Sequence, residues 1–191
     1  MSGPDSPTMT EQRRPPLGHV FVSAVLPVQQ TRPTLADDIS RLWQVLRAAY
    51  DNFEIVLVDD GSNAELGATV RPLLQRLECI RVLRLSRRFG ADAALAAGLD
   101  AAIGDVVVTM NIDTDPPELV PELVELCRKG SGAVVGVDPA RTGQTTLERW
   151  GARLFYRIAN GLFELDTIEH ATTLMSLSRP ALGALLKIKE Q

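Results

Sequence analysis

Two adjacent carboxylates, Asp59 and Asp60, directly follow the apolar run 53–58. Acids at the end of a strand point in different directions as the chain turns. One can then accept hydrogen bonds from a base or ribose while the other stays near a metal. Gly61 permits the turn, and Ser62 is suited to cap a following helix. The same residues also fit a plain turn with a helix cap, so both interpretations stand here.

A second set of oxygen ligands follows the apolar run 105–110. Asn111, Asp113 and Asp115 alternate along the chain, and alternate residues of an extended segment project to the same side. Their carboxylate and amide oxygens are ligands that hard cations prefer. An acidic helix N-terminus, favoured by the helix dipole, would explain the same residues. Two acidic strand ends in one sheet favour the metal site.

Two arginines, Arg87 and Arg88, follow the apolar run 80–85 and precede an Ala-rich segment. Guanidinium groups at a strand end that leads into a helix N-terminus are suited to a phosphate or diphosphate. A solvated basic turn is the alternative. Acids for a sugar and a metal, together with arginines for phosphate, indicate a nucleoside diphosphate ligand.

Composition and missing motifs exclude several classes of protein. The chain has 191 residues, 45% hydrophobic and 23% charged, with two cysteines and a net charge of −4. These values fit one globular domain and give no electrostatic case for a nucleic-acid partner. The sequence contains no GxGxxG after its first strand, no GxxxxGK[ST] and no GxSxG. Their absence counts against a dinucleotide oxidoreductase, a P-loop NTPase and a serine hydrolase.

The elements that must position these residues alternate between strands and helices. Strands that are apolar on both faces and alternate with helices predict a mostly parallel sheet covered by helices on both faces, in a Rossmann-like α/β sandwich. Ligands of such sheets bind beyond the carboxyl ends of the strands. The expected strands are 20–28, 53–58, 80–85, 105–110, 132–137 and 172–178, and the expected helices are 34–50, 64–77, 90–103, 116–129, 145–163 and one that begins near Pro180.

The two ends of this pattern bear on location. Residues 1–17 are rich in proline and lack apolar periodicity, so we expect a disordered tail followed by one domain over 18–191. The sequence shows no signal peptide and no apolar run of about 20 residues that would span a bilayer. We therefore expect a cytoplasmic chain with reduced cysteines. The broad apolar face of 145–163 fits core packing, and it also fits peripheral contact with the inner face of a membrane.

Six segments of the chain form a set that resembles a known family. They read AVLPV, EIVLVDDGS, LSRRFGADAALAAGLDAAIGD, VVVTMNIDTDPPEL, VVGV and LERWGARLFYRIANGLF. This set resembles the polyprenol-phosphate glycosyltransferases of glycosyltransferase family 2, which include dolichol-phosphate mannosyltransferase-like enzymes. The resemblance covers residues from about 20 to 185 and implies the GT-A fold. It also implies inverting transfer of a sugar from a UDP- or GDP-sugar to a lipid phosphate, with Mg²⁺ or Mn²⁺.

The resemblance also implies roles for single residues. Pro27 would line the nucleoside pocket, and Asp59 and Asp60 would contact the base and the ribose. Arg87 would lie near the donor and Asp113 would hold the metal, which makes these two the expected catalytic residues. Asn111 and Asp115 complete the expected metal site, and a homo-oligomer remains open.

Several positions depart from the family's pattern. Thr31 replaces an acid in the segment after the first strand, and Asn111 replaces the first metal aspartate. A neutral amide lowers metal affinity, so we expect weak binding that depends on the nucleotide. Thr173 and Met175 replace an acid and an arginine of the active site, and the chain stops at Gln191, short of the usual end of the catalytic domain.

These departures leave three functions open. The first is an active polyprenol-phosphate glycosyltransferase. The second is a catalytically impaired homologue that keeps nucleotide binding and serves as a regulatory or partner subunit. The third is a transferase with another acceptor and a metal site at Asp113 and Asp115. In the first case another cation must hold the lipid phosphate, and the candidates are Arg88, Arg141 and Arg179.

Overall fold

The computed structural model describes residues 19–62, 65–137 and 171–189. Within them lies one six-stranded sheet with the strand order β3-β2-β1-β4-β6-β5. The strands are β1 (Phe21–Val28), β2 (Asn52–Asp59), β3 (Ile80–Arg84), β4 (Val106–Thr109), β5 (Ala133–Val137) and β6 (Ala171–Ser178). The α-helices are α1 (Leu35–Ala49), α2 (Glu65–Arg76), α3 (Ala91–Ala101), α4 (Val120–Leu126) and α6 (Arg179–Lys189).

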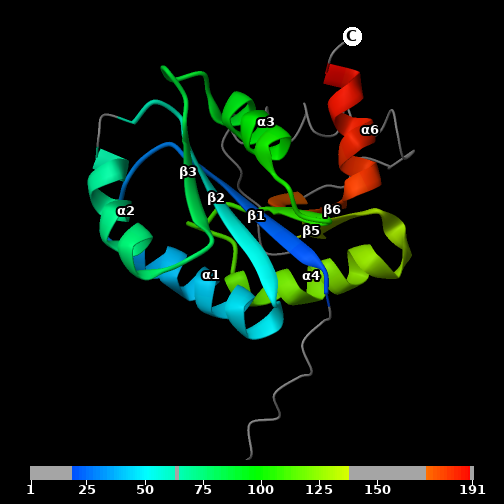
Figure 1. Ribbon diagram of the computed structural model, residues 1–191. Coiled ribbons are helices and arrows are strands. Elements are labelled where there is room, and N and C mark those ends of the chain that lie inside the picture. The colour runs from blue at the N-terminus through cyan, green and yellow to red at the C-terminus, as the bar shows by residue number, and fades with distance from the viewer. Residues whose placement is uncertain (1–18, 63–64, 138–170, 190–191) are drawn as a thin grey trace, which may run out of the picture.

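Helices cover both faces of this sheet, as the sequence predicts (Figure 1). Helices α1, α2 and α4 lie on one face, and α3 and α6 lie on the other. Each strand contributes alternate side chains to two separate cores, so Leu26 and Leu57 pack towards α1 while Val25 and Val56 pack towards α3. Strands β1 to β4 pair in parallel where they are neighbours.

Strand β6 is more regular than the sequence indicates. It pairs antiparallel with β4 on one side and with β5 on the other. Leu174, Met175 and Leu177 are buried in it, on both faces of the sheet. The segment is therefore an interior strand of the sheet, between β4 and β5.

The predicted helix 116–129 is broken into three parts. A 3-10 turn at Pro117–Leu119 leads into α4, and a π-helical turn follows at Cys127–Ser131. The predicted helix 145–163 and the predicted tail 1–17 lie outside the described residues. Across the part of the chain that the structure describes, none of the helices has the length and apolar character that crossing a bilayer requires.

Helix α3 packs unusually close to the sheet because its residues are small. A Cβ atom at Gly98 would lie 2.4 Å from Val25 Cγ1 and 2.8 Å from Val58 Cγ2. Gly98 is itself buried between the helix and strands β1 and β2. The Ala-rich composition of this segment therefore sets the distance of α3 from the strands whose ends carry the candidate site.

We expect Gly98→Ala to lower the free energy of unfolding by about 1–3 kcal/mol, because the added methyl group overpacks the core. The measurement is the urea unfolding midpoint. Gly183→Ala in α6 is the matched control, since no atom lies within 4 Å of the added Cβ. The control should be neutral or stabilising by about 0.5–1 kcal/mol. Equal midpoints for Gly98→Ala and the wild-type chain would contradict the close packing.

Candidate active site

The strand order reverses direction at β1, where β2 lies on one side and β4 on the other. α/β proteins bind their ligands at such a switch point, beyond the carboxyl ends of the strands, and we call this place the crevice. The segment after β1, the acids after β2 and the acids after β4 all begin at this edge. The Asp60 N–H donates to the Val28 carbonyl oxygen at 3.3 Å, which joins the ends of β2 and β1.

Asp60 is fully buried at this edge and holds the arginine segment in place. Its Oδ1 accepts the N–H of Phe89 at 2.7 Å, and its Oδ2 accepts the N–H of Gly90 at 2.9 Å. Gly90 is the cap of α3, so the carboxylate also faces the positive end of the helix dipole. Asp60 thus positions the segment that carries Arg87 and Arg88.

The two arginines of that segment face the surface. The Arg87 guanidinium carbon lies 4.8 Å from the centroid of the Phe89 ring, and both side chains are exposed. Arg88 donates from Nη2 to the Gln29 carbonyl oxygen at 3.0 Å, which links the segment to the loop after β1. Pro27 lies half-buried near the end of β1. These residues surround the β1 side of the crevice.

Asp59 is also fully buried, but it is engaged in a different way. Its Oδ1 accepts the Ser62 N–H at 2.7 Å, and its Oδ2 forms an ion pair with Arg84 Nε at 2.7 Å. Burial raises the pKa of Asp59, but the hydrogen bonds from Ser62 and Arg84 outweigh burial and hold the pKa below its usual value. The expectation that one acid of the pair stays near a metal does not fit these partners.

Sequence reasoning missed Arg84. Asp59 and Arg84 are paired in the register of β2 and β3, so they lie side by side on one face. Residues 80, 82 and 84 of β3 share one face, and Ile80 and Val82 pack on the core that includes α1. The available signal was therefore a charged residue, Arg84, where that face continues. The strand register that brings it to Asp59 was not available.

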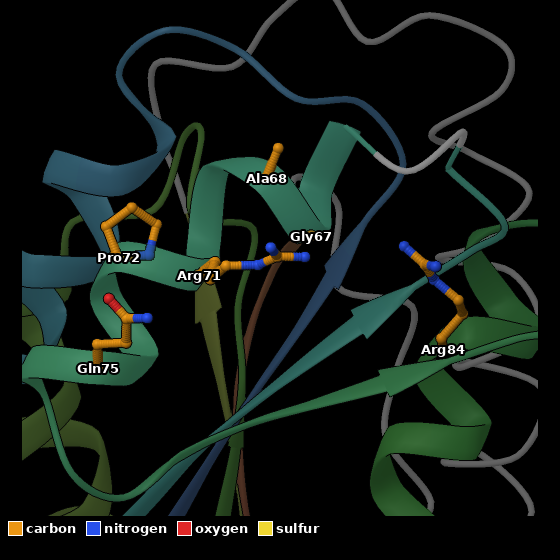
Figure 2. A pocket seen from close by; sticks show the side chains of 6 residues that line it. All are labelled: Gly67, Ala68, Arg71, Pro72, Gln75 and Arg84. Atoms are coloured by element: carbon orange, nitrogen blue, oxygen red, sulfur yellow. The ribbon is translucent and has the colours of Figure 1, made fainter.

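A groove of about 550 Å³ lies beside Arg84, along the outer side of α2. In Figure 2 the side chains of Arg71 and Arg84 extend towards one another from α2 and β3, with Gly67 between them. The lining of this groove includes neither Asp60 nor Asp113. It therefore borders the candidate site without being part of it.

The expected metal ligands lie together, but each has a partner within the chain. The segment after β4 is a turn, because the N–H groups of Thr114 and Asp115 both donate to the Asn111 carbonyl oxygen, at 3.1 and 2.9 Å. The expectation that an extended segment aims all three side chains the same way is therefore wrong. The side-chain Oδ1 of Asn111 accepts the Asp113 N–H at 3.0 Å, and the Asp113 carboxylate forms an ion pair with Arg32.

Asp115 faces the interior instead of the crevice. It is 4% exposed, and its Oδ2 accepts the Asn111 N–H and the Thr173 hydroxyl, each at 2.8 Å. Among the described residues, no three or more His, Cys, Asp or Glu side chains gather in a way that could hold a metal. Asp113 is paired with Arg32, Asp115 is buried, and the amide oxygen of Asn111 already accepts a hydrogen bond. In this arrangement the three side chains do not fit a divalent cation.

Two departures from the family pattern are explained by packing. Thr173 supplies the hydroxyl that satisfies buried Asp115, so it replaces an acid that would repel that carboxylate. Met175 is 3% exposed and packs in the α3 and α6 core. In this chain, position 175 is part of the core and does not project into the crevice.

Arg179 is not at the candidate site. It donates from Nη1 to the Ala102 carbonyl oxygen at 3.0 Å and contacts the Gly104 carbonyl oxygen through Nη2. These carbonyls precede β4 at the opposite edge of the sheet, so Arg179 cannot supply the missing charge. Of the other two expected cations, Arg88 lies at the crevice and Arg141 is outside the described residues.

Curated proteins similar to this chain are sugar transferases. It is 30% identical over 90% of its length to an uncharacterized glycosyltransferase of Synechocystis sp., of which it covers 54%. It is 31% identical over 90% of its length to the undecaprenyl-phosphate 4-deoxy-4-formamido-L-arabinose transferase of Pseudomonas syringae pv. syringae, of which it covers 51%. The chain therefore spans about half the length of these relatives.

Two solved structures have a fold similar to that of this chain. A mannosyltransferase of Pyrobaculum calidifontis, in complex with GDP-Man and Mn²⁺, matches 89% of this chain and 48% of its own at a TM-score of 0.62 and 19% identity. A second is glucosyl-3-phosphoglycerate synthase of Mycobacterium tuberculosis, in complex with Mn²⁺, UDP and phosphoglyceric acid. It matches 89% of this chain and 63% of its own, at a TM-score of 0.57 and 20% sequence identity. The fold is thus of the GT-A type. Residues 23–185 match the family described as glycosyl transferase family 2, and the chain belongs to that family.

Proposed function

We propose that this chain forms the donor-binding domain of a glycosyltransferase that moves a sugar from a nucleoside diphosphate sugar to a polyprenol phosphate. The observation that carries the proposal is Asp60, which fixes the segment of Arg87 and Arg88 at the switch point of the sheet. The undecaprenyl-phosphate transferase similar to this chain supports the lipid acceptor. The relatives carry transferase names, so they lend no support to an impaired regulatory homologue.

The reaction forms one bond and breaks one bond at the anomeric carbon. An oxygen of the acceptor phosphate attacks that carbon, and the bond to the donor's diphosphate breaks on the opposite side, which inverts the configuration. The nucleoside diphosphate leaves with the electron pair. A phosphate monoester has a second pKa of about 6, so the acceptor is already ionised near neutral pH and needs no strong general base. The protein must mainly stabilise the charge on the departing diphosphate.

The site residues take roles that follow from their positions. Pro27 and Asp60 flank the place for the nucleoside, and Arg87 and Arg88 lie where the diphosphate would pass. Asp59 supports this edge through Arg84 and Ser62. The solved neighbours hold Mn²⁺ together with a nucleotide, and a cation at Asn111, Asp113 and Asp115 of this chain would first have to displace Arg32 from Asp113. The lipid acceptor would bring the chain to a membrane surface.

Asp60→Ala is expected to weaken UDP or GDP binding at least tenfold, which corresponds to about 1.4 kcal/mol. The substitution removes the acceptor for two backbone N–H groups and releases the arginine segment. Calorimetric titration with both nucleotides measures the effect. Asp51→Ala is the control, because it removes an exposed acid between α1 and β2, away from the crevice. An unchanged affinity in folded Asp60→Ala would remove this site assignment.

A further inference from the structure

Arg32 spans the crevice at the point where a metal ion is expected. It lies in the loop between β1 and α1. Its Nη2 is 3.2 Å from Asp38 Oδ2, 3.3 Å from the Ile112 carbonyl oxygen, and paired with Asp113 Oδ1. Asp38 is in the first turn of α1, and Asp113 follows β4. The guanidinium group therefore joins the two sides of the switch point.

A metal ion on Asp113 would have to displace this guanidinium group. The other two candidate ligands offer little in exchange, since Asn111 is neutral and Asp115 is buried against Thr173. Asp38 adds a second carboxylate that favours Arg32 in its present place. The charges around the crevice thus suit a fixed guanidinium better than a divalent cation.

We propose that Arg32 binds the diphosphate of the donor in place of a divalent cation, so that nucleotide binding by this chain needs no metal. The inference rests on the proposed function. A guanidinium group carries five N–H donors in a planar fork that matches phosphate oxygens. The contacts of Arg32 use Nη2, whereas its buried Nε has no hydrogen-bond partner among the described residues. Its Nη1 takes part in none of these contacts, so the N–H donors of Nη1 remain for a ligand.

A guanidinium group fixed at this place also serves the reaction through its hydrogen-bond donors. Negative charge develops on the diphosphate as the sugar leaves, and a guanidinium group held by two carboxylates needs no reorientation at that moment. Arg88 reaches the same loop through the Gln29 carbonyl oxygen, so two arginines flank the segment after β1. Both are this chain's own residues, in contrast to a metal ion that must be acquired with the nucleotide.

The test is calorimetric titration of the full 191-residue chain with UDP and with GDP, in EDTA and in Mn²⁺. We expect the affinity of the preferred nucleotide to differ less than about twofold between the two buffers. Arg32→Gln should lower the affinity in EDTA at least tenfold, and Arg32→Lys, which keeps the charge without the fork, should lower it less. Thermal unfolding of each variant checks that it is folded.

Arg41→Gln is the matched control. Arg41 also joins α1 to the segment after β4, through an ion pair with Glu118 at 2.6 Å, but its side chain is 61% exposed on the outside of the domain. It should bind nucleotide as the wild-type chain does. Nucleotide binding that appears only with Mn²⁺, or an unchanged affinity of Arg32→Gln in EDTA, would overturn the inference and leave the proposed function standing. Absence of UDP and GDP binding in both buffers would overturn both.

Discussion

Replacing Gly61 with alanine is expected to lower nucleotide affinity at least tenfold and to destabilise the chain by about 1–3 kcal/mol. A Cβ atom at this position would lie 2.5 Å from both the Arg87 carbonyl carbon and the Arg88 nitrogen. These are backbone atoms, so no side-chain rotation relieves the clash. Gly61 also has a φ of +68°, which is costly for any residue with a side chain.

The effect on binding follows from what the clash displaces. Moving residues 87 and 88 away from Gly61 also pulls the Phe89 and Gly90 N–H groups away from Asp60. The arginines then lose their fixed place at the crevice. Nucleotide titration gives the change in affinity, and amide hydrogen exchange of Phe89 and Gly90 reports whether their bonds to Asp60 open.

Gly67→Ala provides the comparison for Gly61→Ala. Gly67 lies within α2, and its added Cβ would be 3.6 Å from Arg84 Nη2, an ordinary contact. We expect it to leave nucleotide affinity unchanged and to stabilise the helix by about 0.5–1 kcal/mol. Equal nucleotide affinities for Gly61→Ala and the wild-type chain would show that the close approach of the two segments does not matter for binding.

The sequence was sufficient to predict the layers of the fold, because apolar runs and helical spacing record which faces are buried. It did not predict the direction of β6, since a β-like run such as 172–178 looks the same in a parallel and an antiparallel strand. The helix predicted over 116–129 ends as expected, but its 3-10 start at Pro117–Leu119 and its π-helical turn at Cys127–Ser131 were not predicted. Gly130 and Gly132 take positive φ values directly after residue 129, which ends regular helical geometry there.

The candidate site was predictable where single residues follow strands, and not where partners come from elsewhere in the chain. Asp60 and the segment of Arg87 and Arg88 are brought together as expected at one edge of the sheet. The expectation for Asn111, Asp113 and Asp115 assumed an extended segment, whereas backbone hydrogen bonds to Asn111 close it into a turn. Arg32 gave no signal, because its role depends on the position of Asp113 across the crevice.

The opposite edge of the sheet holds a buried acid that sequence reasoning also missed. Glu54 is 6% exposed, and its Oε1 accepts the Ser23 hydroxyl at 2.5 Å and the Ile103 N–H at 2.9 Å. Its Oε2 pairs with Arg81 Nε at 2.7 Å. Ser23 in turn accepts the Gly104 N–H at 2.8 Å. The signal available was a polar residue inside an otherwise apolar run, Ser23 in β1 and Glu54 in β2.

This network explains why the segment between α3 and β4 contains Gly104. A Cβ atom there would lie 2.6 Å from the Ser23 nitrogen and 2.7 Å from the Phe21 carbonyl oxygen. Arg179 closes the same turn from the other side by binding the Ala102 and Gly104 carbonyl oxygens. The residues AAIGD of the family-like motif therefore hold α3 on the sheet, at the edge opposite the candidate site.

Glu54→Ala is expected to lower the free energy of unfolding by about 3 kcal/mol, as the loss of one partner from a buried pair does. The lower end of the usual range applies because Arg81 is 43% exposed and can return to water. The Ser23 hydroxyl and the Ile103 N–H stay buried without their acceptor, and such groups carry most of the cost. Urea unfolding measures the loss, and nucleotide affinity of the folded variant should change little.

The pH dependence of this loss identifies the charge as its cause. Burial raises the pKa of Glu54, but hydrogen bonds from Arg81, Ser23 and Ile103 outweigh burial and leave the pKa below its usual value. A lowered pKa means that the stabilisation is present above the unfolded value of about 4.3 and is lost as the pH falls through the folded value. The stability difference between wild type and Glu54→Gln should therefore shrink on going from pH 6 to pH 3.

Glu118→Ala, which removes an exposed pair with Arg41, is the control and should cost less than about 1 kcal/mol at any of these pH values. A Glu54→Gln difference that stays constant with pH would show that shape and hydrogen bonding, and not ionisation, make Glu54 stabilising.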